Sequence, residues 1–280
     1  MNEGTITSSP GPTPNARSAI VSDVDPQTYC VTPEAVKAVM TPRTKAVIAV
    51  HLFGNVAPVR EIEALGVPVV EDAAQSAGTV AADGRPGALG TIATFSFFPS
   101  KNLGGLGDGG AVVTSSPELD ERVRMLRFHG SHDKVTYDEV GYNSRLDELQ
   151  AAVLRVQLPH LDGWADVRRA GGRAYADAGL GALVDLPQPT PGAEPAWHLY
   201  VIASDRPDDV AAALAAAGHG HKPYYRTPVH RQPAMAAYGA DAVLPGTDEA
   251  ARRHLAIPIS GAFTAEQAEQ VVAAIRPVFA

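Results

Sequence analysis

The sequence predicts an α/β fold with a mainly parallel central sheet, followed by a smaller C-terminal α+β domain. Three observations lead to this prediction. Short apolar runs bounded by turn residues recur in the first half of the chain, which is typical of strands buried on both faces. Helix-like stretches separate the earlier runs, and this alternation favours a parallel sheet with helices on both faces. A long amphipathic helix then leads into a C-terminal part of mixed patterns.

The first elements follow from local patterns. Residues 1–17 are rich in Gly, Pro, Ser and Thr, and they predict a disordered tail. A helix is expected over 33–40, because Thr32 is a suitable cap and a proline occupies the first helical position. A second helix is expected over 58–65. The five predicted strands cover residues 19–24, 45–50, 67–72, 91–98 and 110–115.

The second half begins with a helix over 117–128, capped by Ser116. A long helix follows, kinked at Pro159 and continuing to Ala178. Its apolar face contains Leu146, Leu149, Val153 and Val156. In the C-terminal part, the sequence pattern predicts strands over 197–203 and 221–229 and helices over 208–218 and 264–279. The expected domain organisation is a tail (1–17), a partial large domain (18–160), and a linking helix with a small C-terminal domain (161–280).

Composition narrows the class of protein. The chain has 280 residues, 45% of them hydrophobic and 19% charged, as in an ordinary globular protein. Its net charge of −8, without a basic stripe, argues against nucleic acid or an anionic membrane as the main partner. Cys30 is the single cysteine, so disulfides and a cysteine metal cage are excluded. No signal peptide or spanning segment is recognisable, and a cytoplasmic location is expected.

One lysine stands out in residues 95–115, FSFFPSKNLGGLGDGGAVVTS. Gly105, Gly107 and Gly110 satisfy G-x-G-x-x-G, but they run into another strand instead of a helix, which rejects dinucleotide binding. The glycines indicate a loop whose backbone passes close to something flat or bulky. The chain contains 18 arginines and only 5 lysines, and only an amine can lose its proton and attack a carbonyl. By itself, however, a solvated surface role for Lys101 is the more common case.

Three polar residues near strand ends strengthen the chemical interpretation. Asp72 ends a predicted strand, where open α/β sheets bind ligands. A carboxylate there can keep a pyridinium nitrogen protonated, although many such carboxylates are helix caps. Ser96 could bind a phosphate oxygen or be an ordinary core hydroxyl. Gln75 could hold that carboxylate or a phenolic oxygen of the cofactor, or be a surface glutamine.

Five longer motifs carry a family resemblance: VHLFGNVAPVREI, VVEDAAQSAG, TFSFFPSKNLGGLGDGGAVVT, LRFHGS and GYNSRLDELQAAVL. In this order they resemble the DegT/StrS family of sugar aminotransferases, from about Ala19 to the C-terminus. The resemblance implies the pyridoxal-phosphate-dependent transferase fold of type I. It also implies that Lys101 forms a Schiff base with pyridoxal 5′-phosphate. The other cofactor-binding residues that it implies are Asp72, Gln75, Ser96, Asn143 and His51.

The resemblance assigns these residues different roles. Asp72 would face the pyridine nitrogen, with Gln75 beside it, and Ser96 would bind the phosphate. Asn143 would reach the phosphate bound by a neighbouring subunit, which implies a homodimer with shared active sites. His51 would lie near the site, although a core histidine is the more common case.

The implied reaction is the transfer of an amino group from glutamate or glutamine to a nucleotide-linked keto-deoxysugar, for amino-sugar or antibiotic-glycoside biosynthesis. Lys101 would also move a proton as general acid and base. A histidine in its place would indicate the dehydratase branch of the family, so lysine favours transamination.

The chain departs from the family pattern before residue 19. Family members carry a longer segment there, with a Gly-Thr/Ser turn that binds the phosphate at a helix N-terminus. Three explanations remain open at this level: another polypeptide supplies the segment, the chain is a non-catalytic or complementing subunit that partners a full-length homologue, or its start is misassigned.

Other functions are less well supported. His219 and His221 form an H-x-H pair, but no further ligands stand at metal spacing, so no metal site is expected. Lys222, Tyr224 and Tyr225 could line a sugar site or an edge strand. No G-x-S-x-G motif occurs, which argues against a serine hydrolase.

Overall fold

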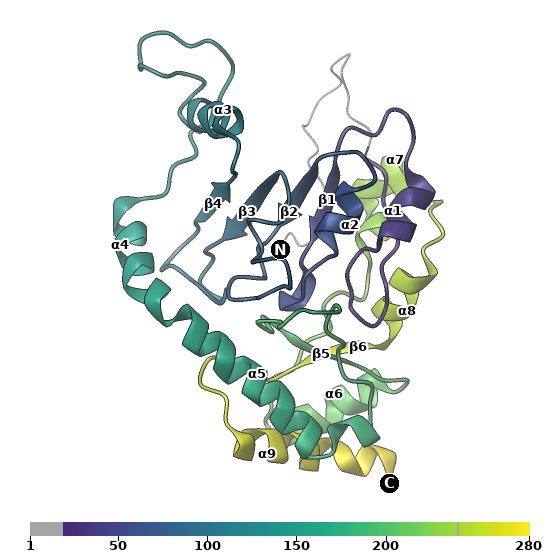
Figure 1. Cartoon of the computed structure of the whole chain (residues 1–280). Helices are drawn as coiled ribbons and strands as arrows, with labels where there is room; N and C mark the ends of the chain where they lie inside the picture. Colours follow the sequence, from purple (N-terminus) through teal and green to yellow (C-terminus); the bar gives the residue numbers. More distant parts are fainter. Residues whose placement is uncertain (1–18, 240) are drawn as a thin grey trace.

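The N-terminal half is organised around a four-stranded sheet, seen in a computed structural model that describes residues 19–239 and 241–280 (Figure 1). The strands lie in the order β1-β2-β3-β4. The first three are parallel, with Val50, Asp72 and Thr94 in register, and β4 is antiparallel to β3. The bounds are Val47–Val50, Val69–Asp72, Ile92–Ser96 and Gly110–Val113. The prediction of an α/β fold with a mainly parallel sheet is confirmed.

Two helices accompany the first strands. Helix α1 (Pro33–Val39) begins as predicted, because the Thr32 hydroxyl accepts the backbone N–H of Ala35. Helix α2 (Val59–Glu63) is shorter than predicted, and a 3₁₀ turn over Leu52–Gly54 precedes it. The cluster that they bury against β1 and β2 contains Val36, Ala49, Val59, Ile62 and Val69.

A long helical segment joins the two halves (Figure 1). Helix α3 (Pro117–Arg127) follows β4, and α4 (Glu148–Gln157) begins after an extended loop. A 3₁₀ turn over Leu158–His160, which contains Pro159, connects α4 to α5 (Leu161–Asp177). The helix is thus interrupted by a 3₁₀ turn at the predicted proline.

The C-terminal part packs helices on a two-stranded antiparallel sheet, β5 (Tyr200–Ala203) with β6 (His254–Ile257). Its helices are α6 (Pro207–Ala216), α7 (Ala236–Gly239), α8 (Pro245–Arg253) and α9 (Ala265–Ile275). Short 3₁₀ turns cover Leu180–Ala182, Val229–Arg231, Pro233–Met235 and Arg276–Phe279. The buried cluster around Tyr175, Leu214, Leu255 and Val271 is separate from the one in the large sheet. We propose that the boundary near residue 160 separates two domains on this basis.

Two predicted strands are wrong. Residues 19–24 make a single bridge, between Val24 and Val31. The carboxylate of Asp23 accepts the backbone N–H groups of Gly246 and Thr247, so this segment is held by the start of α8 instead of a sheet. Residues 221–229 likewise make one bridge, between Lys222 and Ala256, and the prolines in this segment interrupt a hydrogen-bonded ladder.

The expectation that all strands of the large sheet are buried on both faces is also wrong. In β4, the side chains of Val112 and Val113 are 45% and 37% exposed. The predicted tail, residues 1–17, lies outside the described residues.

Candidate active site at the carboxyl edge of the large sheet

Asp72 and Gln75 lie where β2 ends. Asp72 is half-buried, and one oxygen of its carboxylate accepts the backbone N–H of Ala74 at 3.1 Å. Gln75 is 4% exposed, and its Oε1 accepts the N–H of Phe53 at 2.6 Å. Its Nε2 is buried and makes no hydrogen bond. Because a buried donor without an acceptor is costly, this amide is available to an oxygen of a bound group.

Ser96 and Lys101 lie where the neighbouring strand, β3, ends. The Ser96 hydroxyl accepts the N–H of Phe98 at 3.3 Å. The carbonyl of Phe98 in turn accepts the N–H of Lys101 at 2.9 Å. Since β2 and β3 are parallel, this turn and Asp72 belong to the same edge of the sheet. The structure therefore brings Asp72, Gln75, Ser96 and Lys101 to one edge.

The glycines after Lys101 allow the chain to pass close to itself. A Cβ at Gly104 would lie 2.6 Å from the carbonyl oxygen of Pro99. A Cβ at Gly110 would lie 2.6 Å from that of Phe95. Gly104 and Gly110 thus lie against the backbone of residues 95–99, whereas a Cβ at Gly105 would lie 2.7 Å from the Gln150 side chain.

His51 has protein partners at both ring nitrogens. Its Nε2 lies 2.9 Å from Oε2 of Glu71, and its Nδ1 accepts the N–H of Ala57 at 3.0 Å. Both His51 and Glu71 are 0% exposed. Burial alone would raise the pKa of Glu71. The hydrogen bonds from His51 and the backbone together lower it by more than burial raises it, so the pKa lies below its ordinary value. His51 occupies a core position beside the site, with no ring nitrogen left for a cofactor.

Asn143 is not brought to this edge. It is exposed in the loop between α3 and α4, where Nε of Arg145 donates to its Oδ1 at 3.4 Å. Because β4 runs back across the sheet, α3 begins at the opposite edge, and the loop after it projects away from the sheet (Figure 1). The predicted role of Asn143 towards a neighbouring subunit stays a prediction.

Sequence reasoning missed Asn102 and His198. Both are 8% exposed, and Nδ1 of His198 lies 3.3 Å from Oδ1 of Asn102. Burial, with smaller contributions from the charges of Lys101 and Arg168, lowers the pKa of His198 to about 3. A polar residue directly after Lys101, and a histidine entering an apolar strand, were the available signals.

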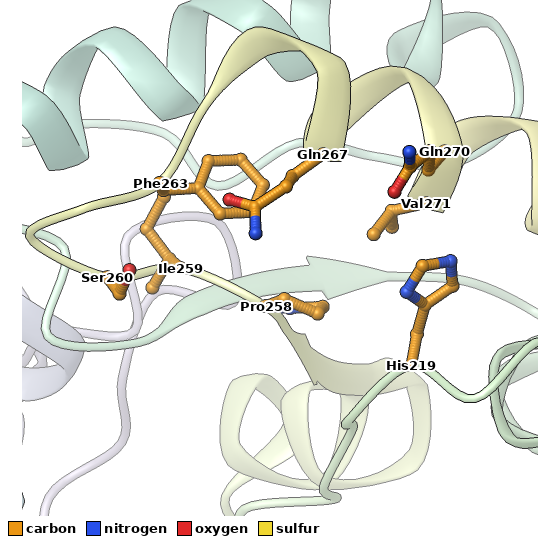
Figure 2. A pocket seen from close by; sticks show the side chains of 8 residues that line it. All are labelled: His219, Pro258, Ile259, Ser260, Phe263, Gln267, Gln270 and Val271. Carbon is orange, nitrogen blue, oxygen red and sulfur yellow. The ribbon is translucent and has the colours of Figure 1, made fainter.

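Two shallow pockets lie near the small sheet. Figure 2 shows one of about 260 Å³, lined by residues of α9 and of the segment after β6, together with His219. None of the predicted site residues lines it. The second, of about 290 Å³, is lined by Asn102, Arg168 and the Ser260–Ala262 segment among others. It therefore borders the residue next to Lys101.

Within the described ranges, no three His, Cys, Asp or Glu residues are grouped as metal ligands. In the same ranges, no helix has the length and apolar character needed to cross a membrane. The residues at the sheet edge do fit a pyridoxal-type cofactor, since they offer an amine, a carboxylate and an unsatisfied buried amide donor.

The chain is similar to named proteins over most of its length. It is 41% identical over 258 residues to the pleiotropic regulatory protein of Geobacillus stearothermophilus, covering 89% of this chain and 69% of the relative. It is 43% identical over 251 residues to dTDP-3-amino-3,4,6-trideoxy-alpha-D-glucose transaminase of Streptomyces venezuelae, covering 87% and 66%.

The chain is also similar to a solved structure. The crystal structure of DesV from S. venezuelae in complex with a ketimine intermediate superposes with a TM-score of 0.86 at 41% identity. It matches 90% of this chain and 70% of the DesV chain. The chain thus spans about two thirds of the length of its relatives. A family model for the DegT/DnrJ/EryC1/StrS aminotransferases matches residues 15–276. The chain belongs to the DegT/DnrJ/EryC1/StrS aminotransferase family.

Proposed function

We propose that the chain is a pyridoxal-phosphate-dependent aminotransferase that moves an amino group from glutamate or glutamine to a nucleotide-linked keto-deoxysugar. The observation that carries the proposal is the meeting of Lys101, Asp72 and the unsatisfied amide of Gln75 at one sheet edge. The 43% identity to a dTDP-aminosugar transaminase supports this substrate class. We place the reaction in the cytoplasm, consistent with a single, buried cysteine.

Each residue has a distinct task in this proposal. The cofactor, when bound, supplies an electron sink for the substrate carbon. The Asp72 carboxylate would keep the proton on the ring nitrogen, and the Nε2–H of Gln75 would donate to an oxygen of the cofactor. Lys101 would hold the cofactor through its amine, and as a free amine it could carry a proton to and from the substrate carbon. Ser96 binds the phosphate.

We further propose a homodimer in which Asn143 reaches the phosphate site of the partner. Exposed apolar side chains support association. Leu149 and Val156 of α4 are 83% and 72% exposed, and Leu106 of the loop after Lys101 is 78% exposed. The backbone N–H of Leu106 donates to Oε1 of Gln150, so the loop after Lys101 lies against the first turn of α4.

Cofactor attachment tests the proposal. Purified chain mixed with pyridoxal phosphate should develop the visible absorption band of a lysine-bound cofactor, and borohydride should fix the cofactor on Lys101. Lys101→Ala should lose both signals, whereas Lys37→Ala, which removes an exposed lysine of α1, should keep them. Glutamate should then bleach the band and form 2-oxoglutarate, and a dTDP-linked keto-sugar should restore it.

Borohydride labelling of Lys101→Ala to the wild-type level would contradict the assignment of the lysine. An unlabelled wild-type chain that associates with a full-length homologue and raises its activity would instead favour the complementing subunit.

A further inference from the structure

Asn102 joins three segments at the base of the lysine loop. Its Nδ2 donates to the carbonyl of Ala77, two residues beyond Gln75, and to the carbonyl of Ala196, each at 3.2 Å. Its Oδ1 lies 3.3 Å from the ring of His198. The residue next to Lys101 is thereby tied both to the segment that follows Asp72 and to the segment that enters β5.

These contacts also determine the tautomer of His198. Because two carbonyl groups face the nitrogen of the Asn102 amide, its oxygen is the end that meets the imidazole. An amide oxygen only accepts, so Nδ1 of His198 carries the hydrogen and donates it. The pKa of about 3 keeps the ring neutral at physiological pH, in agreement with this arrangement.

The backbone around His198 is held with strain. Trp197 has φ of 39°, in the left-handed region that few side chains adopt. One Nη of Arg168 donates to the carbonyl of Trp197 at 2.9 Å, and the same nitrogen lies 3.4 Å from the carbonyl oxygen of His198. A Cβ on Gly54 would lie 2.5 Å from the backbone nitrogen of His198, so the two backbones are in direct contact. Strain retained next to a buried polar pair suggests that the geometry of this junction matters for function.

We propose that Asn102 and His198 are positioning residues, which hold Lys101 at the distance from Asp72 that cofactor attachment requires. The inference rests on the proposed function, since it concerns the lysine assigned there. Neither side chain needs to touch substrate. Asn102 fixes the backbone of its neighbour, and His198 fixes the orientation of Asn102.

Hydrogen exchange tests the proposal without any cofactor. In Asn102→Ala, the amide hydrogens of residues 97–104, including that of Lys101, should exchange at least about tenfold faster than in wild type. Asn55→Ala is the matched control. Asn55 is 2% exposed and also joins distant segments, with Nδ2 bonded to Thr28 and Gln188 and Oδ1 bonded to Val56 and Thr190. It should leave exchange in 97–104 at the wild-type rate.

Cofactor attachment gives the second readout. Asn102→Ala should form the visible band at least about tenfold more slowly than Asn55→Ala, since a displacement of one ångström can cost a hundredfold in rate. His198→Asn keeps a donor near the place of Nδ1 and should attach the cofactor at a near wild-type rate. His198→Ala removes the donor and should resemble Asn102→Ala.

The outcomes separate the two proposals. If exchange in 97–104 and the rate of band formation are the same in Asn102→Ala and Asn55→Ala, the positioning role is overturned while the aminotransferase assignment stands. If wild type itself attaches no cofactor, the proposed function fails, and the role of Asn102 in cofactor attachment is overturned with it. Faster exchange in Asn102→Ala would then show only that Asn102 stabilises the loop.

Discussion

His51 donates a hydrogen bond to Glu71 across 2.9 Å, and neither side chain is exposed. The direction is set by Ala57, whose N–H occupies Nδ1 and leaves the hydrogen of a neutral ring on Nε2. The same carboxylate accepts N–H groups from Gly87, Leu89 and Gly90 at 2.7–2.9 Å. A single buried charge therefore joins β1, β2 and the loop before β3, directly beside Asp72.

Glu71→Gln should lower the free energy of unfolding by roughly 3 kcal/mol, because the amide nitrogen replaces an acceptor and faces backbone donors. Glu63→Gln is the control. Glu63 accepts from Thr91 and pairs with Arg60, but its side chain is 32% exposed, so its loss should cost under about 1 kcal/mol. Urea unfolding followed by circular dichroism measures both values, and equal midpoints would contradict the role of Glu71.

His198 predicts a pH dependence of stability. Its pKa lies near 3 in the folded chain and near 6.5 when unfolded, so the unfolded state binds more protons between these values. Stability is thus intact above pH 6.5 and is lost as the pH falls towards 3. His198→Asn does not titrate at this position. The advantage of wild type over His198→Asn should therefore shrink by up to about 1.4 kcal/mol per pH unit below 6.5. Urea titrations at pH 7.5, 6 and 5 would reveal this trend, and a constant difference would refute it.

Local pattern predicted the parallel strands well, because β1, β2 and β3 are short, apolar and bounded by turns. It failed for residues 19–24, whose apolar pattern is the same but whose Asp23 binds the start of α8, 223 residues away. The site likewise contains residues that a local pattern could place and residues that it could not. Asp72 ends β2 and Lys101 lies in the turn after β3, its parallel neighbour, so the two could be placed at the same edge. Asn102 and His198 are 96 residues apart, and no local pattern encodes their contact.

Gly54→Ala should be among the most destabilising small substitutions in the chain. Gly54 has φ of 92°, and its Cβ would lie 2.5 Å from the nitrogen of His198 and 2.8 Å from that of Trp197. Gly66 is a matched control, because its φ is 93° and nothing lies within 4 Å of its Cβ. Gly66→Ala should cost about 1 kcal/mol from backbone strain alone.

Gly54→Ala should lower the free energy of unfolding by about 2 kcal/mol more than Gly66→Ala does. This difference measures the close contact between the backbones of Gly54 and His198. Thermal unfolding of both variants tests this. Equal losses would mean that the junction can move apart without cost.

Leu149→Glu should weaken association of the chain. Leu149 is 83% exposed on α4, one heptad before Val156, which is 72% exposed, so the two share one helix face. Burying a carboxylate in an apolar interface without a partner costs several kcal/mol, which is enough to shift a dimer to monomers at micromolar concentration. Arg155→Glu places a carboxylate on a different face of the same helix and should leave the proposed dimer intact. Sedimentation velocity of the three proteins measures this directly. A wild-type chain that sediments as a monomer, or a dimer that tolerates Leu149→Glu, would show that this face is not the interface.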